Sequence, residues 1–197
     1  MARKKRTRRL LRNKPKSPKA NILPNHITAV IGAILVICGV GYLLWQRSVL
    51  SFSHAPSPAP VSENQSFYPQ PVRIQIPSVG IDDAITPSRI VRGIWQTSAT
   101  GASHLDISAR PGQPGNIILY GHNYDHIFKA LSNVQVGQSI MVSTSDGNTR
   151  LYQVTQTKTV RPDEIESIEP TEHEVLTVYT CVGFLDTKRF IVQATPL

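Results

Sequence analysis

The stretch LTVYTCVGFLDTKRFIVQA, residues 176–194, contains two apolar runs joined by a short loop. The runs Val175–Thr180 and Arg189–Ala194 are rich in β-branched and aromatic side chains, which indicates two neighbouring β-strands. Cys181 directly follows the first strand, and Arg189 opens the second. If the two strands pair through the intervening loop, the thiol and the guanidinium come close together at one rim of a sheet.

Cys181 allows two interpretations. A neighbouring guanidinium favours the thiolate form of a cysteine and can donate to a developing oxyanion, which suits a nucleophile. A buried structural cysteine fits the same residues equally well, because cysteine packs as a small hydrophobe. The other cysteine, Cys38, lies inside an apolar segment near the N-terminus, so the two thiols cannot pair within one chain. Cys181 is therefore expected to be either reactive or part of an intermolecular bridge.

A nucleophilic thiol needs a base or a cationic partner. His122 ends the apolar segment NIILYGH, residues 116–122, and strand-end side chains often line a site. The other histidines after residue 48 lie in a linker or in polar stretches, where we expect solvated positions: His54, His104, His126 and His173. Spacing alone does not rank His122 far above His126. A metal held by both is not predicted, because no glutamate separates them and no third ligand besides Cys181 is evident.

Residues 71–197 consist mostly of short strand patterns separated by turn residues. In the segment 72–76, apolar and polar side chains alternate, which is typical of a half-buried strand. Further strands are predicted at Ile117–Gly121, Ser139–Ser143 and Arg150–Val160. Within these residues, Tyr124–Asn133 is the segment expected to be helical. Short strands with few helices indicate an all-β domain, either a small closed barrel or a sandwich.

The net charge of +8 is concentrated in the N-terminal tail. Ten of the 21 basic residues precede residue 20, and the first acidic residue is Glu63. The remainder of the chain is mildly acidic, which argues against a nucleic-acid-binding domain. A basic run without carboxylates suits anionic phosphates, and the apolar segment that follows it favours those of lipid.

The segment Ile27–Trp45 has no charged residue and is long enough to cross a bilayer as a helix. Tyr42 and Trp45 lie near its end, where aromatic rings favour the membrane interface. Because the cations precede this segment, we predict an uncleaved, single-pass signal anchor with a cytoplasmic N-terminus (residues 1–26) and an extracellular domain.

Residues 46–70 are predicted to be a linker between the membrane span and the folded domain. Pro56, Pro58, Pro60 and Pro69 are interspersed with serine and alanine, a composition that favours extended conformations over a packed core. The folded domain is expected to comprise residues 71–197, which is enough for a single core.

Several of these features occur together in a known family. The residues Thr177-Val178-Tyr179-Thr180-Cys181 resemble the sortase signature T-L-x-T-C, with valine in place of leucine. Arg189 matches the arginine that the family carries eight positions after its cysteine. Leu119-Tyr120-Gly121-His122 is similar to the strand-end Gly-His that supplies the sortase histidine. The motif T-x-x-T-C is weak alone, but its combination with this arginine, this histidine and the membrane topology is specific.

The resemblance implies a closed eight-stranded β-barrel with a few short helices, preceded by one transmembrane helix. It implies that Cys181 attacks a threonine carbonyl in a C-terminal sorting motif such as L-P-x-T-G of an exported protein. His122 would protonate the departing amine and then deprotonate the incoming one, from a peptidoglycan precursor or a pilin. Arg189 would hold the substrate backbone and stabilise the oxyanion, and Thr180 would help to bind the substrate. No cofactor is implied.

Two alternatives remain at this point. A non-catalytic, membrane-anchored peptide-binding domain, or a cysteine peptidase that transfers the acyl group to water, would have the same general composition. Some sortases respond to calcium, and acidic residues between Asp163 and Glu174 precede the cysteine strand. These residues lack the alternating Asp spacing of a calcium loop, and a charge run is usually a solvated face.

Overall fold

The computed structural model describes residues 25–48, 50–57 and 68–197. The chain divides into two compact units, Met1–Gly41 and Tyr42–Leu197. Helix α1, Asn25–Ser48, contains the apolar run expected to cross a membrane. Among the described residues, its window His26–Leu43 meets the length and composition of a membrane span. The basic tail expected at residues 1–26 lies almost entirely outside the described part of the chain.

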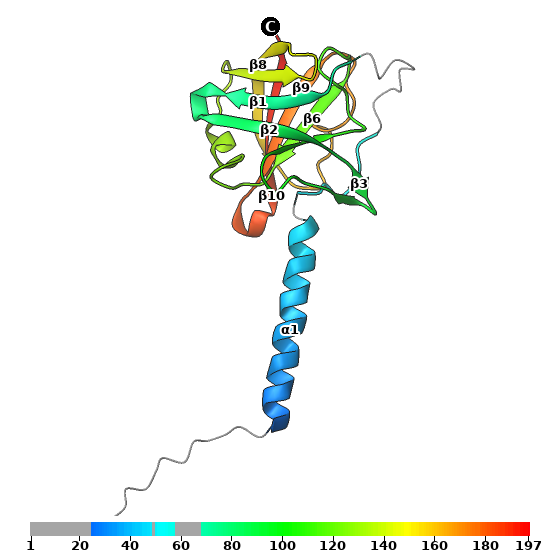
Figure 1. The fold of residues 1–197 in the computed structure, drawn as a ribbon, viewed down its shortest axis with the longest axis vertical. Helices are drawn as coiled ribbons and strands as arrows, with labels where there is room; N and C mark the ends of the chain where they lie inside the picture. Colours follow the sequence, from blue (N-terminus) through cyan, green and yellow to red (C-terminus); the bar gives the residue numbers. More distant parts are fainter. Residues whose placement is uncertain (1–24, 49, 58–67) are drawn as a thin grey trace, which may run out of the picture. The chain divides into compact units, whose positions relative to one another are not determined.

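Eight strands of the second unit close into a barrel in the order β1-β2-β5-β6-β9-β10-β8-β7 (Figure 1). This confirms the all-β barrel architecture. The barrel strands are β1 Pro71–Ile76, β2 Ile81–Ser88, β5 Ala102–Leu105, β6 Asn116–Gly121, β7 Ser139–Thr144, β8 Thr149–Val160, β9 Val175–Val182 and β10 Lys188–Pro196. A separate two-stranded ribbon consists of β3 Ile90–Val91 and β4 Ile94–Trp95. Short 3₁₀ helices span Pro77–Val79, Lys129–Asn133 and Phe184–Asp186.

The predicted helix at Tyr124–Asn133 is wrong. This segment contains turns followed by the 3₁₀ helix Lys129–Asn133, with no α-helix. Its hydrogen bonds do not follow the four-residue spacing of an α-helix: those from Ile127 N to Tyr124 O and from Leu131 N to Phe128 O span three residues. The apolar residues that suggested one helical face instead fold back into the barrel, where Ile127, Phe128 and Leu131 are buried.

Strands β2 and β5 were not predicted from the sequence. Strand β2 contains two aspartates and Pro87, residues that are depleted in strands. Its alternation is nevertheless present, since Ile81, Asp83 and Ile85 are its inward positions. Strand β5 has only four residues, too few to show a period. It is specified by its neighbours, pairing in parallel with β2 and antiparallel with β6.

Alternate residues of β6, β9 and β10 face two separate apolar clusters. The interior cluster fills the barrel and is mainly aliphatic, with Leu119, Val178 and Val192 among its members. The second cluster lies against the outer face of the same strands. We call it the outer cluster; its members are Leu50, Phe52, Trp95, Leu105, Ile118, Tyr120, Val160, Ile168, Tyr179, Cys181 and Ile191. A strand that is buried on both faces has a nearly continuous apolar sequence, which explains the apolar sequences of β6 and β9.

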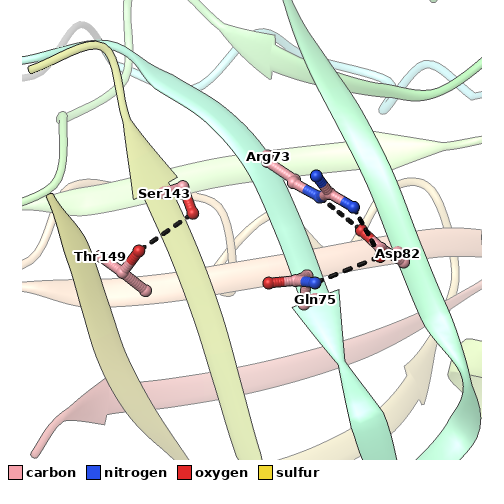
Figure 2. Close-up of polar contacts among 5 residues, drawn as sticks. All are labelled: Arg73, Gln75, Asp82, Ser143 and Thr149. Carbon is pink, nitrogen blue, oxygen red and sulfur yellow. Dashed lines mark hydrogen bonds and ion pairs between the residues drawn. The ribbon is translucent and has the colours of Figure 1, made fainter. Parts of the chain in front are cut away.

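The β1–β2 and β7–β8 pairs carry polar cross-strand contacts on their exposed faces (Figure 2). Arg73 Nε and Nη2 donate to the two carboxylate oxygens of Asp82 at 2.6 and 2.7 Å, and Gln75 donates to the same carboxylate at 3.2 Å. Ser143 and Thr149 share a hydrogen bond of 3.1 Å across the second pair. The Arg73 guanidinium lowers the pKa of Asp82, so this carboxylate stays ionised. These contacts favour the observed register without contributing to either apolar cluster.

The linker expected at residues 46–70 is partly a packed segment. Leu50 and Phe52 are buried in the outer cluster, and Ser53 N donates to Pro162 O at 2.8 Å. The expectation that this stretch contributes nothing to a core is therefore wrong for Leu50–Ser53. Strand β1 begins at Pro71, where the folded domain was expected to start. Residues 58–67 lie outside the described part of the chain.

Candidate active site

Cys181 and Arg189 are neighbours on the outer face of the barrel. They are directly paired residues of the antiparallel strands β9 and β10. Because side chains alternate across a strand, Cys181 shares the outer face with Tyr179, and Arg189 shares it with Ile191. The proximity inferred from the sequence is therefore present, and the register of two strands produces it.

His122 lies beside the same pair because β6 runs parallel to β9. Gly121 of β6 pairs with Thr180 of β9. The residues that directly follow this pair are His122 after Gly121 and Cys181 after Thr180. Both side chains line one cleft, together with Trp95, Gln96, Thr97, Asn123, Tyr124, Leu185 and Asp186. His126 does not line this cleft, although sequence spacing could not separate it from His122.

Gly121 allows the chain to turn closely beneath His122. A Cβ atom at this position would lie 2.9 Å from a methyl group of Ile127 and 3.0 Å from the ring of Phe128. Phe128 N also donates to His122 O at 3.2 Å. The glycine of the Gly-His pair is thus required for close packing rather than for an unusual backbone angle.

The thiol of Cys181 is almost completely covered, with 2% of the residue exposed. Burial raises the pKa of Cys181 to about 12, and the positive charge of Arg189 opposes this shift. Desolvation therefore dominates over the guanidinium in this arrangement, since a buried thiolate is poorly solvated. The thiol is protonated at neutral pH in the covered site.

The guanidinium of Arg189 is buried and bonded to main-chain carbonyls. Its Nη1 donates to Asp186 O at 2.9 Å and Lys188 O at 3.1 Å. Its Nη2 donates to Ser51 O at 2.7 Å. Within the described residues, the buried Nε has no hydrogen-bond partner. Arg189 thus already binds one carbonyl from outside the barrel and keeps a further donor available.

The imidazole of His122 is held by two neighbours, Thr97 and Tyr124. Its Nε2 shares a hydrogen bond of 3.1 Å with Thr97 Oγ1, and its ring stacks on Tyr124 with centroids 4.9 Å apart. Burial lowers the pKa of His122, while the carboxylate of Asp186 raises it. No pattern in the sequence indicated Thr97 or Asp186, because both lie in loops that only the fold brings to His122.

The loop between β9 and β10 has a constrained backbone at the edge of the cleft. Leu185 and Asp186 have φ angles of 53° and 56°, in the left-handed region that disfavours residues with a Cβ. Asp186 raises the pKa of Cys181 as well as that of His122. Its carboxylate therefore favours the protonated forms of both side chains.

Thr180 does not line the cleft. Its side chain is fully buried, and its hydroxyl donates to Gly121 O at 2.8 Å. This bond joins the ends of β6 and β9, one residue before His122 and one residue before Cys181. The observed contact is structural, whereas the resemblance implied substrate binding.

The segment Leu50–Phe52 packs against the outer cluster, and Leu50 also lines the cleft. Leu50 O accepts from the hydroxyl of Tyr179 at 3.1 Å, and Ser51 Oγ accepts from Trp95 N at 3.1 Å. The Phe52 ring meets those of Tyr179 and Trp95 at centroid distances of 5.1 and 5.8 Å. In the sequence, the only local hint of this packing is that two apolar residues, Leu50 and Phe52, stand just before the proline-rich stretch.

No three His, Cys, Asp or Glu side chains in the described ranges 25–48, 50–57 and 68–197 are placed to hold a metal ion. Several of the acidic residues between Asp163 and Glu174 have other partners. Asp163 bonds Arg161, and Glu174 accepts from Tyr152 and from the main chain of Gly112. These contacts are ion pairs and hydrogen bonds with neighbouring residues of the fold.

A closed β-barrel with a thiol and an imidazole at one cleft, and a guanidinium paired with the thiol across two strands, defines the class of barrel domain, and three comparisons specify the family. A family model described as the sortase domain matches residues 74–197. Sortase A of Bacillus anthracis is 28% identical over 124 residues, which are 61% of this chain and only 56% of that protein. The chain thus spans little more than half the length of this relative.

Solved structures show the same architecture. Sortase C1 from Streptococcus agalactiae superposes with a TM-score of 0.55 at 28% identity, covering 64% of this chain and 66% of that one. Sortase C from Clostridium perfringens, whose structure was solved with the C-terminal cell wall sorting motif, shares the fold with a TM-score of 0.55 at 22% identity, covering 66% and 72%. The chain belongs to the sortase family, whose members are cysteine transpeptidases.

Proposed function

We propose that this protein is a membrane-anchored transpeptidase that uses Cys181 as its nucleophile. The observation that carries the proposal is the direct pairing of Cys181 with Arg189 on the face that His122 also reaches. Its substrates would be exported proteins with a C-terminal sorting motif of the L-P-x-T-G kind. The acceptor would be an amine of a cell-wall precursor or of a pilin.

In the first half-reaction, the thiol proton of Cys181 passes to His122, and the resulting thiolate attacks the threonine carbonyl carbon of the sorting motif. A tetrahedral oxyanion forms, and its collapse breaks the threonine–glycine C–N bond. His122 gives a proton to the departing amine, so the leaving group is neutral. The products are a thioester on Cys181 and a peptide with a free N-terminus.

In the second half-reaction, an incoming amine attacks the thioester carbonyl. His122 accepts the proton of that amine, the C–S bond breaks, and a new amide forms. The thiolate and the imidazolium are thereby regenerated. If water attacks in place of the amine, the same groups catalyse hydrolysis, so the acceptor decides the outcome.

Arg189 is proposed to bind the oxyanion. Its Nη2 now donates to the carbonyl oxygen of Ser51 at 2.7 Å, next to the thiol that pairs with it across the strands. This main-chain carbonyl has the chemistry of a peptide substrate. Donors already aimed at such an oxygen need little reorganisation when negative charge develops there.

The covered site is proposed to be a resting state. With a pKa of about 12, the thiol of Cys181 is not nucleophilic at neutral pH. Removal of Leu50–Phe52 would expose the sulfur to water, lower its pKa and free Arg189 Nη2 for a substrate carbonyl. Since Phe52 is held by ring contacts and Ser51 by two hydrogen bonds, a bound substrate can replace these contacts with equivalent ones.

Thr180 is proposed to position the two strand ends rather than to contact the substrate. Its hydroxyl holds Gly121 O, and a shift of β6 along β9 would move His122 away from Cys181. The N-terminal helix is proposed to be a single-pass anchor with the basic tail in the cytoplasm. That orientation rests on the distribution of cations alone.

The test is transpeptidation by the purified full-length chain in detergent. The chain is incubated with a library of sorting peptides and several amines, and mass spectrometry identifies new amides. We expect amide products with the wild type and none with Cys181→Ala. Cleaved acid without amide would indicate a hydrolase. Binding of peptides without any turnover by the wild type would contradict the catalytic proposal and favour a peptide-binding domain.

A further inference from the structure

Two loops at one end of the barrel expose apolar side chains to solvent. The first is the turn Val91–Gly93 of the β3–β4 ribbon, and the second is the β9–β10 loop with Phe184 and Leu185. In Figure 1 both loops lie at the lower end of the barrel, opposite the C-terminus. Phe184 is 85% exposed, and Val91 and Leu185 are also exposed. Single exposed apolar residues are common, but three on two loops at the same end of the barrel need an explanation.

The β9–β10 loop is held in a shape that keeps its apolar residues outside. Leu185 has a left-handed backbone with φ of 53°, which is unfavourable for a side chain of this type. Arg189 Nη1 fixes the loop through Asp186 O, and Thr187 Oγ1 donates to Phe184 O at 3.0 Å. A strained segment that the surrounding bonds hold in place is a frequent mark of function.

Cations accompany the apolar side chains. Arg92 and Lys188 are exposed on the two loops, and Arg89, at the base of the ribbon, is paired with Asp106. Asp186, the carboxylate of the β9–β10 loop, lines the cleft. Exposed aromatic and aliphatic side chains bordered by lysine and arginine are typical of surfaces that bind the interface of a bilayer.

The length of the connecting chain limits the distance between this end of the barrel and the proposed membrane span. The apolar window of α1 ends at Leu43, and Leu50 is already packed in the outer cluster. Seven residues can span at most about 25 Å even when extended. Ser51, the next residue, is bonded to Trp95 N at the base of the ribbon and to Arg189 Nη2 at the base of the loop. The chain therefore enters the barrel between the two apolar loops.

We propose that the tips of these loops, Val91–Arg92 and Phe184–Leu185, dock into the headgroup region of the bilayer that α1 crosses. This inference rests on the proposed anchor and not on the proposed catalysis. The partner is a lipid surface, because the tether length and the mixed apolar and cationic composition both match it. The cleft beside the β9–β10 loop then opens at the membrane surface, where it would receive substrates presented close to the bilayer.

The experiment is depth-dependent fluorescence quenching of the full-length chain in phosphatidylcholine and phosphatidylglycerol vesicles. Phe184→Cys is labelled with bimane in a Cys38→Ser/Cys181→Ser background, and lipids with a nitroxide near the headgroup act as quencher. The matched control is Leu151→Cys on β8. Leu151 is 47% exposed and accepts from the C-terminal Leu197 N, which places it at the opposite end of the barrel.

We expect the label at residue 184 to be quenched at least about twofold more than the label at residue 151, because only the first reaches the interfacial layer. In a second measurement, the label is placed at Arg92→Cys, and Phe184→Asp/Leu185→Asp should weaken its quenching.

Equal quenching at positions 184 and 151 would overturn the proposal. A label at 184 that is not quenched by lipid but changes its emission with added sorting peptide would assign the surface to substrate. A label at 184 that is not quenched by lipid but changes with protein concentration in detergent would assign it to a second copy of the chain. Neither outcome depends on whether the protein catalyses transpeptidation.

Discussion

The barrel interior and the outer cluster lie on opposite faces of the same strands, but different parts of the chain seal them. Interior residues such as Leu119 and Val178 are enclosed by the barrel strands and the turn that follows His122. The outer cluster is rich in aromatic rings and is closed by Leu50–Phe52, a segment that belongs to no barrel strand. Cys181 lies in the second cluster.

The two clusters therefore differ in what must move before a residue inside them becomes exposed. Opening the interior requires strands to part, whereas opening the outer cluster requires only the loss of a short segment held by a few hydrogen bonds and ring contacts. A nucleophile in the interior would remain inaccessible in every folded state. On the outer face it can be dry and protonated at one moment and exposed at another, while the barrel stays intact.

The largest effect is expected from the thiol. Cys181→Ala should lower kcat/KM for a cognate sorting peptide by at least about four orders of magnitude, because no other group can form the thioester. Cys38→Ala should leave the rate near that of the wild type, since Cys38 lies in the apolar helix. Steady-state cleavage by the two purified variants measures the contrast. Comparable residual activity in Cys181→Ala would exclude the covalent mechanism.

Removal of the cover should expose the thiol. Leu50→Ser with Phe52→Ser should increase the rate of Cys181 alkylation at neutral pH, because the pKa of about 12 falls towards its ordinary value. Each pKa unit changes the thiolate fraction tenfold, so an increase between about ten- and a thousandfold is expected. Labelling is followed by mass spectrometry in a Cys38→Ser background.

The matched control for this double variant is Val72→Ser, which replaces an exposed apolar residue of β1. It should leave the labelling rate unchanged. A double variant that labels as slowly as the wild type, with an unchanged melting temperature, would show that Leu50–Phe52 does not protect the sulfur.

Substitution of His122 or Arg189 should lower the rate less than loss of the thiol does. His122→Ala and Arg189→Lys should each lower kcat/KM by about two orders of magnitude or more, because one removes the proton carrier and the other the planar donor pair. His126→Ala should cost little, since His126 does not line the cleft. Thermal melting of each variant checks the fold first. A His126→Ala variant as impaired as His122→Ala would contradict the assignment.

The smallest effect concerns stability and involves His104. The expectation of a solvated position is wrong for this residue, because strand β5 is covered on both faces and His104 is fully buried. Burial lowers its pKa to about 4, Nε2 donates to Ala109 O, and the nearby charges are Asp106 and Arg110. Because the unfolded chain binds a proton at higher pH than the folded one, stability falls as the pH drops below about 6.5. Between pH 7 and pH 5 the loss from this residue is about 2 kcal/mol.

Urea unfolding at the two pH values measures this loss. The lowered pKa of His122 adds a change of the same sign, so the comparison uses His104→Gln, which should remove the His104 part of the dependence. An unchanged pH dependence in His104→Gln would show that this histidine is not the titrating group.

Much of the site could be predicted from local sequence. The apolar runs of β6, β9 and β10 were found at nearly their observed bounds, because strands buried on both faces leave a continuous apolar pattern. The proximity of Cys181 and Arg189 followed from the expected pairing of two neighbouring strands. The roles of these residues and of His122 remain predictions, which rest on the resemblance to sortases.

The sequence by itself determined the candidate membrane helix, the strands that are buried on both faces and the candidate site residues, since each depends on a local period or motif. The tertiary structure alone decided that His122 and not His126 lines the cleft of the thiol, because the parallel register of β6 and β9 places the residue after Gly121 beside the strand that carries Cys181. It also decided that Leu50 and Phe52 are buried in the outer cluster beside Cys181. Burial depends on what the rest of the chain covers, and no local pattern in a short segment records that.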